Sequence, residues 1–152
     1  MTSAQNPKTI ELYGHGIQHE AEVTDAVITP GMLVVRTATG VRPHNVAGFG
    51  AAHVAVEYGM VGRGIDDDYA VGDQATFKTY QAGSGVYALL DDGNDVSAGD
   101  FLISAGDGTL ELQAADSTAV IVAQAMEAVN SGASVARIQV ELVAPFTRTL
   151  PA

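Results

Sequence analysis

The spacing of turn residues is the strongest constraint on the fold of this chain. Glycine, proline and paired Gly-Asp or Asp-Gly residues recur along most of the sequence, from Pro30-Gly31 to Ser131-Gly132. Turn signals at intervals of roughly 8–12 residues are typical of all-β barrels and sandwiches. The sequence therefore predicts an all-β fold, a small β-barrel or sandwich of short strands.

The segments between these turns have the composition of strands. Two of them, 54–58 and 135–143, alternate apolar residues with small or charged ones, as a half-buried strand requires. Two further stretches, 19–26 and 119–129, suit either a helix or a strand, and the alternation in the second favours a strand. Ala144-Pro145-Phe146 is expected to end the last strand. The predicted strands are 32–37, 53–58, 74–80, 86–90, 101–104, 109–112, 118–122 and 134–143.

The first eighteen residues differ from the rest. A chain of 152 residues is long enough for one hydrophobic core. We therefore predict a single β-rich domain over residues 19–152, preceded by an extended N-terminal arm over residues 1–18. The arm is either a frayed terminus or a segment that adds a strand to a neighbour's sheet edge. Its apolar residues Ile10, Leu12 and Tyr13 are the candidate docking contacts.

Charge and cysteine content exclude several classes of function. The chain has 18 acidic and 7 basic residues, a formal net charge of −11 and no cysteine. An acidic chain is poorly suited to a phosphate backbone, so no nucleic-acid partner is expected, and disulfides and thiolate chemistry are impossible. No Lys or Arg occurs between Lys78 and Arg137. This acidic region is either a solvated face that keeps the protein soluble or a surface matched to a basic partner.

Targeting signals are not evident in the sequence. The N-terminus lacks the basic stretch and apolar run of a signal peptide, and no segment approaches the ~20 apolar residues of a membrane helix. We expect a soluble protein that is made in the cytoplasm and does not contact a membrane.

No motif assembles a catalytic centre. Ser84 lies among adjacent glycines without the strand, turn and helix of a nucleophile elbow, and a flexible turn is the better interpretation. The acidic runs 66–68 and 91–95 lack the spacing of a calcium loop, and turn chemistry explains the second run. We therefore expect no enzyme activity, no metal and no cofactor. The remaining enzyme alternative is a metal site formed by His15, His19 and Glu20.

An ordered set of turn phrases resembles the head decoration, or capsid cement, proteins of tailed bacteriophages. The resemblance extends from about Glu11 to Val143. The phrases that carry it are 29–33 (TPGML), 41–44 (VRPH), 62–67 (GRGIDD), 69–73 (YAVGD), 86–90 (VYALL), 96–102 (VSAGDFL), 106–110 (GDGTL) and 136–141 (ARIQVE).

This resemblance implies a β-rich protein on the outer surface of the capsid in the virion. Such a protein is made in the host cytoplasm, binds the expanded head and stabilises it by bridging subunits of the major capsid protein. It is commonly a homotrimer and has no catalytic residues. The small residues Ala47, Gly48, Gly50, Ala51 and Ala52 are candidates for a subunit interface, although a tight bulge explains them equally well. The alternative function is another virion or surface module, such as a head-fibre base or a glycan-binding adhesin.

Overall fold

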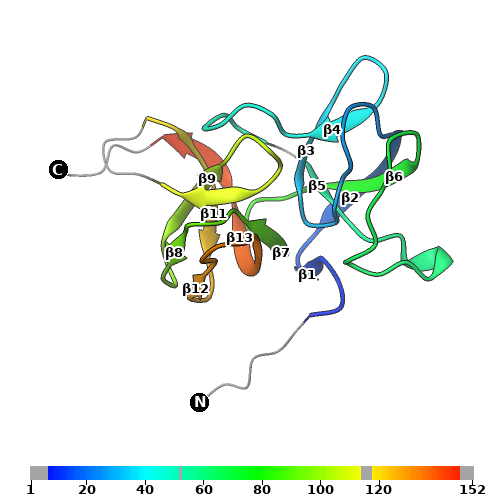
Figure 1. The fold of residues 1–152 in the computed structure, drawn as a ribbon. Helices are drawn as coiled ribbons and strands as arrows, with labels where there is room; N and C mark the ends of the chain where they lie inside the picture. The colour runs from blue at the N-terminus through cyan, green and yellow to red at the C-terminus, as the bar shows by residue number, and fades with distance from the viewer. Residues whose placement is uncertain (1–6, 52, 114–117, 148–152) are drawn as a thin grey trace.

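The computed structural model describes residues 7–51, 53–113 and 118–147 and consists almost entirely of strands and turns (Figure 1). Two sheets lie side by side and form two lobes. The one helical segment among these residues is a short 3-10 turn, η1 (Gly59–Val61). The predicted all-β class is confirmed.

The five-stranded sheet forms what we call the N-lobe. Its strands, in spatial order, are β2 (Gly16–Glu22), β6 (Gln74–Tyr80), β5 (His53–Ala55), β3 (Leu33–Arg36) and β4 (Val41–Pro43). All four pairings are antiparallel. A further bridge joins Val23, just after β2, to Val41 of β4, so the two outer strands of the sheet also meet.

The six-stranded sheet forms the C-lobe. Its strands, in order, are β1 (Glu11–Tyr13), β7 (Gly85–Leu90), β10 (Leu110–Leu112), β9 (Phe101–Ser104), β11 (Val120–Ala125) and β13 (Ala136–Thr147). Because β13 also pairs with β7, the pairings of the last five strands close into a ring. A short ribbon of β8 (Asp95–Val96) and β12 (Val129–Asn130) extends from this lobe.

Two hydrophobic clusters match the two lobes. The larger is built on the C-lobe and includes Leu90, Leu102 and Ile138, but it also takes Leu33 and Val54 from the N-lobe sheet. The smaller contains Phe77, Tyr69 and Ile28 in the N-lobe. Alternation along β3 explains this division, because Leu33 faces one cluster and Val34 the other.

The predicted strands correspond to strands in the structure, and parts of the two ambiguous stretches are strands as well. Residues 19–22 belong to β2, and the segment after Ala119 forms β11. The prediction that Pro145 ends the last strand is wrong, since β13 continues to Thr147. The register with β11 shifts between Leu142 and Phe146, and β7 pairs only as far as Glu141. Proline is tolerated there because it lies at a bulge on an unpaired edge.

The N-terminal segment departs from the predicted extended arm. Residues 11–13 form β1, which pairs with β7 of the same chain, and β2 begins at Gly16. Ile10 is 0% exposed in the larger core. The apolar group that suggested an arm is therefore part of the fold from Ile10 onward. Residues 1–6 of the predicted arm lie outside the described residues.

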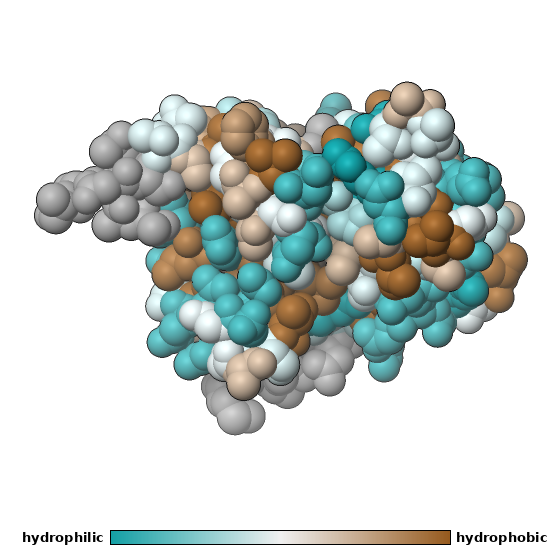
Figure 2. Space-filling view, turned by 45° about the horizontal axis from the view of Figure 1, so that its top comes forward, coloured by the Kyte–Doolittle hydropathy of each residue, from teal (hydrophilic) through white to brown (hydrophobic). Residues whose placement is uncertain are grey.

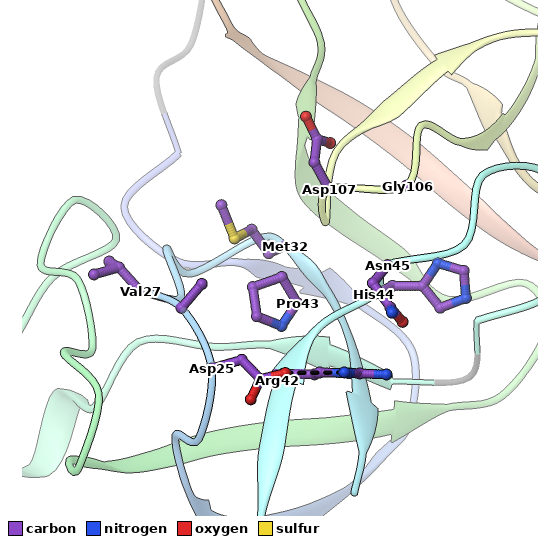
Figure 3. A pocket seen from close by; sticks show the side chains of 10 residues that line it. Asp25, Val27, Met32, Arg42, Pro43, His44, Asn45, Gly106 and Asp107 are labelled. Carbon is purple, nitrogen blue, oxygen red and sulfur yellow. Dashed lines mark hydrogen bonds and ion pairs between the residues drawn. The ribbon is translucent and has the colours of Figure 1, made fainter.

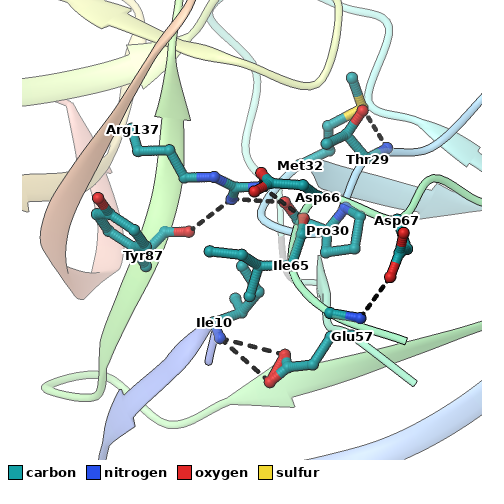
Figure 4. Close-up of polar contacts among 11 residues, drawn as sticks. Ile10, Thr29, Pro30, Met32, Glu57, Ile65, Asp66, Asp67, Tyr87 and Arg137 are labelled. Atoms are coloured by element: carbon teal, nitrogen blue, oxygen red, sulfur yellow. Dashed lines mark hydrogen bonds and ion pairs between the residues drawn. The ribbon is translucent and has the colours of Figure 1, made fainter. Parts of the chain in front are cut away.

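Arg137 of β13 links the two lobes (Figure 4). Its guanidinium donates hydrogen bonds of 2.7 Å to the backbone oxygens of Pro30 and Ile65, and one of 3.4 Å to that of Tyr87. It also lies 3.5 Å from the Asp66 carboxylate and over the Tyr87 ring. Since Pro30 and Ile65 lie in loops connected to the N-lobe sheet, one largely buried cation holds those loops against the C-lobe.

A second set of polar contacts attaches the N-terminal strand to the N-lobe. Glu11 accepts hydrogen bonds from Lys78 at 2.9 Å and Tyr80 at 3.1 Å, and the Lys78 contact is the main reason that the pKa of Glu11 is lowered. The backbone N–H of Ile10 donates to the Glu57 carboxylate at 3.2 Å (Figure 4). These contacts place β1 between the lobes.

The first prediction concerns this junction. Arg137→Met keeps the aliphatic stem but removes the donors to Pro30 and Ile65, so we expect a loss of about 3 kcal/mol in the free energy of unfolding, measured by urea denaturation. Arg42→Gln is the matched control, because the Arg42–Asp25 pair is partly exposed and should contribute at most about 1 kcal/mol. Equal losses in the two variants would refute the junction role of Arg137.

The second prediction concerns Gly31, which packs against Arg137. Gly31 has φ +99°, and a Cβ there would lie 2.5 Å from Nη1 of Arg137 and 2.8 Å from the Tyr87 oxygen. Gly72 has a similar φ of +96° with no atom within 4 Å. Gly72→Ala should lose roughly 1–2 kcal/mol from backbone strain alone, whereas Gly31→Ala should lose clearly more in the same urea titration. Similar losses would show that only the backbone matters at Gly31.

Candidate interaction surface

The residues considered for catalysis have structural partners. The Ser84 hydroxyl is buried and accepts a hydrogen bond from the backbone N–H of His15 at 3.1 Å. His19 and Glu20 are consecutive residues of strand β2 and so point to opposite faces. Within the described ranges, no group of three or more His, Asp or Glu side chains is placed to hold a metal ion. The metal site considered for His15, His19 and Glu20 is therefore not assembled in this structure.

Turn chemistry also explains the repeated Gly-Asp units. Asp73 accepts a hydrogen bond from the backbone N–H of Ala70, and Asp100 accepts one from Ser97, both at 2.9 Å. Asp107 accepts one from Thr109 at 3.0 Å. Gly72, Gly99 and Gly106 have positive φ. Each unit thus combines a left-handed glycine with a capping carboxylate.

His44 is buried between the lobes. Its Nε2 lies 3.0 Å from the Gly50 backbone oxygen, which can only accept, so Nε2 donates and Nδ1 accepts from the Ser104 hydroxyl at 2.7 Å. The Ser104 oxygen in turn accepts from the Gly106 N–H at 3.2 Å. Burial lowers the pKa of His44. The neutral imidazole therefore holds the loop after β4 against strand β9.

A pair of histidines, His19 and His53, lies on the N-lobe sheet. His19 Nε2 and His53 Nδ1 lie 3.0 and 2.7 Å from the Thr79 hydroxyl, and both rings contact Phe77. Burial, then the charges of Arg36 and His19, lower the pKa of His53. The two histidines therefore form a polar edge of the smaller hydrophobic cluster.

The subunit-interface candidates lie in the loop after β4, and the described ones pack against the same chain. The Gly48 N–H donates a hydrogen bond to the Ser104 backbone oxygen at 2.9 Å, and the Gly48 backbone oxygen accepts one from the Val120 N–H at 2.8 Å. A Cβ at Gly106 would lie 2.9 Å from the Ala47 nitrogen. Small residues therefore allow a close approach between this loop and the C-lobe. Ala51 is partly buried, Gly50 is exposed, and Ala52 lies outside the described residues.

The same loop exposes apolar side chains beside the C-terminal end of β13. Phe49 is 64% exposed and Val46 is 43% exposed. A Cβ at Gly50 would lie 4.0 Å from Pro145, and the Phe146 ring packs edge-on against Phe101 at 5.5 Å. We call Val46, Phe49, Phe101, Pro145 and Phe146 the Phe49 patch. In the space-filling view, small groups of hydrophobic residues lie between hydrophilic residues on both lobes (Figure 2).

The three predicted contact residues of the N-terminal segment differ in accessibility. Ile10 is fully buried, so its side chain is not available to another protein in this structure. Leu12 is half-buried, and Tyr13 is 44% exposed. The Tyr13 ring covers Gly85, and its hydroxyl donates to the Met126 sulfur at 3.3 Å. Tyr13 is thus the one member of this group that offers a substantial exposed surface.

The two lobes differ in charge. Residues 81–147 include eight acidic residues in the described part, and their single basic residue, Arg137, points into the lobe junction. Burial and mutual repulsion raise the pKa of Asp91 and Glu111, with Asp107 contributing to both. The C-lobe surface is therefore acidic and without a compensating cation on its own segment.

Sequence reasoning missed two features of this surface. Arg137 could have been singled out, because it is the first basic residue after Lys78 and interrupts an apolar alternating strand. Met60 and Val61 in η1 are strongly exposed, Met60 to 88%, and nothing in their sequence distinguishes them from core residues. No helix in the described part of the chain is long and apolar enough to cross a membrane.

Comparison with known proteins gives a likeness of fold. No protein-family model matches the sequence, and no curated protein matches it either. Among solved structures, the chain is similar to the N base of the head fibre protein gp8.5 of bacteriophage phi29, with a TM-score of 0.57 and 14% identity. The match covers 86% of this chain and 95% of that chain. The two therefore share a fold over nearly the whole of both.

The third prediction follows from the buried His44. The pKa of His44 is lowered in the folded state, so folding opposes protonation of its ring. The contribution of neutral His44 to stability is therefore complete above its ordinary pKa of 6.5 and declines as the pH falls below that value. His44→Gln retains a donor for Gly50 but does not titrate. The loss of melting temperature between about pH 7.5 and 5 should therefore be smaller in the variant than in the wild type. An unchanged loss would assign the pH dependence to other groups, such as His53.

Proposed function

We propose that this chain is a structural protein of the head of a tailed bacteriophage. It is a capsid decoration protein that binds the outer surface of the expanded shell and bridges major capsid protein subunits. The observation that carries the proposal is the fold likeness to a phage head fibre base over 95% of that chain. The turn phrases that resemble decoration proteins support the same class of protein.

The physical properties of the molecule suit such a role. The closed pairing of the C-lobe and the buried junction at Arg137 give a rigid body with few free strand edges. The acidic C-lobe would discourage binding to packaged DNA and keep the free protein dispersed. Its function would then reside in the surfaces that it joins, and no bond needs to be made or broken.

A homotrimer is the assembly that we propose. A shell whose local symmetry is threefold presents three equivalent sites, and a C3 trimer meets each with the same surface. Three weak contacts acting together can raise apparent affinity by roughly 10²–10⁴, if all engage at once. Shell expansion would control binding, because misplaced sites cannot be bridged. The Phe49 patch is the proposed subunit interface, and Tyr13 is the proposed capsid contact.

A head-fibre base is the second candidate. The specific observation in its favour is that the structural match is itself the base of a head fibre. A fibre base would attach to the shell and carry a further protein segment. A cement protein would instead raise the temperature at which heads lose their DNA.

The fourth prediction tests the assembly. Wild-type protein should have the mass of a trimer in sedimentation equilibrium. Phe49→Asp should shift it toward the monomer, because a buried unpaired carboxylate opposes association. Met60→Asp is the control, since Met60 is more exposed and lies outside the patch, and it should remain a trimer. A wild-type monomer, or equal behaviour of the two variants, would contradict the proposed interface.

Mixing with phage heads tests the function. Heads of the encoding phage that lack this protein should bind purified protein at saturating, symmetric positions by electron microscopy when expanded, and not before expansion. Bound protein should raise the temperature of DNA release if the role is cement. A visible projection without added thermal stability would favour the fibre base, and absence of binding would refute both.

A further inference from the structure

A preformed pocket lies where the N-lobe loops meet the C-lobe turn at Gly106–Asp107 (Figure 3). Its volume is about 330 Å³, and its lining is mostly apolar. Val27, Met32 and Pro43 come from the N-lobe side, and Asp107 lies on the opposite side. A cavity of this size accommodates one or two side chains of another protein. We call it the Met32 pocket.

The walls of the Met32 pocket are fixed by contacts within the chain. Leu33 N–H donates to the Gly108 oxygen at 2.8 Å, and Gly108 N–H donates to the His44 oxygen at 3.0 Å. The Met32 side chain lies against Gly108, where a Cβ would come within 3.1 Å of its sulfur. The pocket therefore exists before a ligand arrives, and little ordering opposes binding.

Charge around the pocket is one-sided. Arg42 on the N-lobe side is neutralised by Asp25 at 2.9 Å. Asp107 has no cation among its described partners, and Asp91 and Glu111 are close enough that Asp107 contributes to raising the pKa of both. The lining of this largely apolar pocket thus includes one carboxylate, that of Asp107, without a cation beside it among the described residues. A ligand that combines an apolar group with a positive charge complements both features.

We propose that the Met32 pocket binds an aliphatic side chain flanked by Lys or Arg on an extended segment of a partner protein. The aliphatic group fills the space between Met32, Val27 and Pro43, and the flanking cation lies beside Asp107. This inference does not depend on the partner being a capsid protein.

The test uses the complete chain and short peptides of defined sequence. Chemical shifts of the ¹⁵N-labelled protein are followed during titration with acetyl-Lys-Leu-Lys-amide. Saturable shifts at Val27, Met32, Asn45 and Asp107 are expected, with an apparent Kd on the order of 1 mM for so small a ligand. Acetyl-Lys-Gly-Lys-amide and acetyl-Glu-Leu-Glu-amide should each shift these residues much less, because each lacks one of the two features.

Variants locate the binding. Ala26 is exposed and lines the pocket, so Ala26→Trp should fill it and abolish the shifts, while Ala38→Trp, on an exposed turn elsewhere, should leave them unchanged. Asp107→Asn should weaken binding about three- to fivefold, as for one exposed ion pair. Asp100→Asn, which removes a similar capping carboxylate, should have no effect.

Several outcomes would overturn the proposal. These are an absence of saturable shifts, equal binding of the Lys-Gly-Lys or Glu-Leu-Glu peptide, and unchanged binding in Ala26→Trp. If Ala26→Trp does not fold, the comparison of Asp107→Asn with Asp100→Asn decides. Because no phage head enters the experiment, failure here leaves the proposed function to its own test.

Discussion

The guanidinium of Arg137 is the contact on which the arrangement of the two lobes depends. It is the one basic side chain of residues 81–147, and it is used inside the molecule, against the backbone oxygens of Pro30 and Ile65. Carbonyl groups buried at such a junction need donors, and the planar guanidinium supplies several from one position. Gly31 leaves room for it, and the Tyr87 ring covers it. The loops around Pro30 and Ile65 are thereby fixed relative to β13, and the pocket and patches at the junction are fixed with them.

The placement of this cation also determines the character of the outer surface. With Arg137 directed inward, the carboxylates of the C-lobe have no basic neighbour on their own segment. Most of the exposed large apolar residues lie in loops or near strand ends, as at Phe49 and Met60, and Ile17 within β2 is exposed as well. These acidic and apolar surfaces are the ones on which the proposed attachment role depends.

Local sequence predicted most strands because turn chemistry is local. Gly-Asp units such as Gly72-Asp73 form their turns through a positive φ and a carboxylate that caps a nearby N–H, and neither requires distant residues. The end of the last strand was misjudged for the opposite reason. Whether Pro145 can continue a strand depends on the bulge against β11 and on the absence of β7 beyond Glu141, which are properties of pairing partners.

The sequence by itself determined the all-β class, the positions of most turns and the acidic balance, since these follow from neighbouring residues and from composition. Only the tertiary structure decided the roles of Ile10, of the loop containing Gly48 and of Arg137. A short apolar group is the same in sequence whether it docks on a partner or fills its own core, and Ile10 does the latter because β1 pairs with β7, 75 residues away at Glu11 and Val86. Burial and pairing between distant segments are collective properties, and no local pattern encodes them.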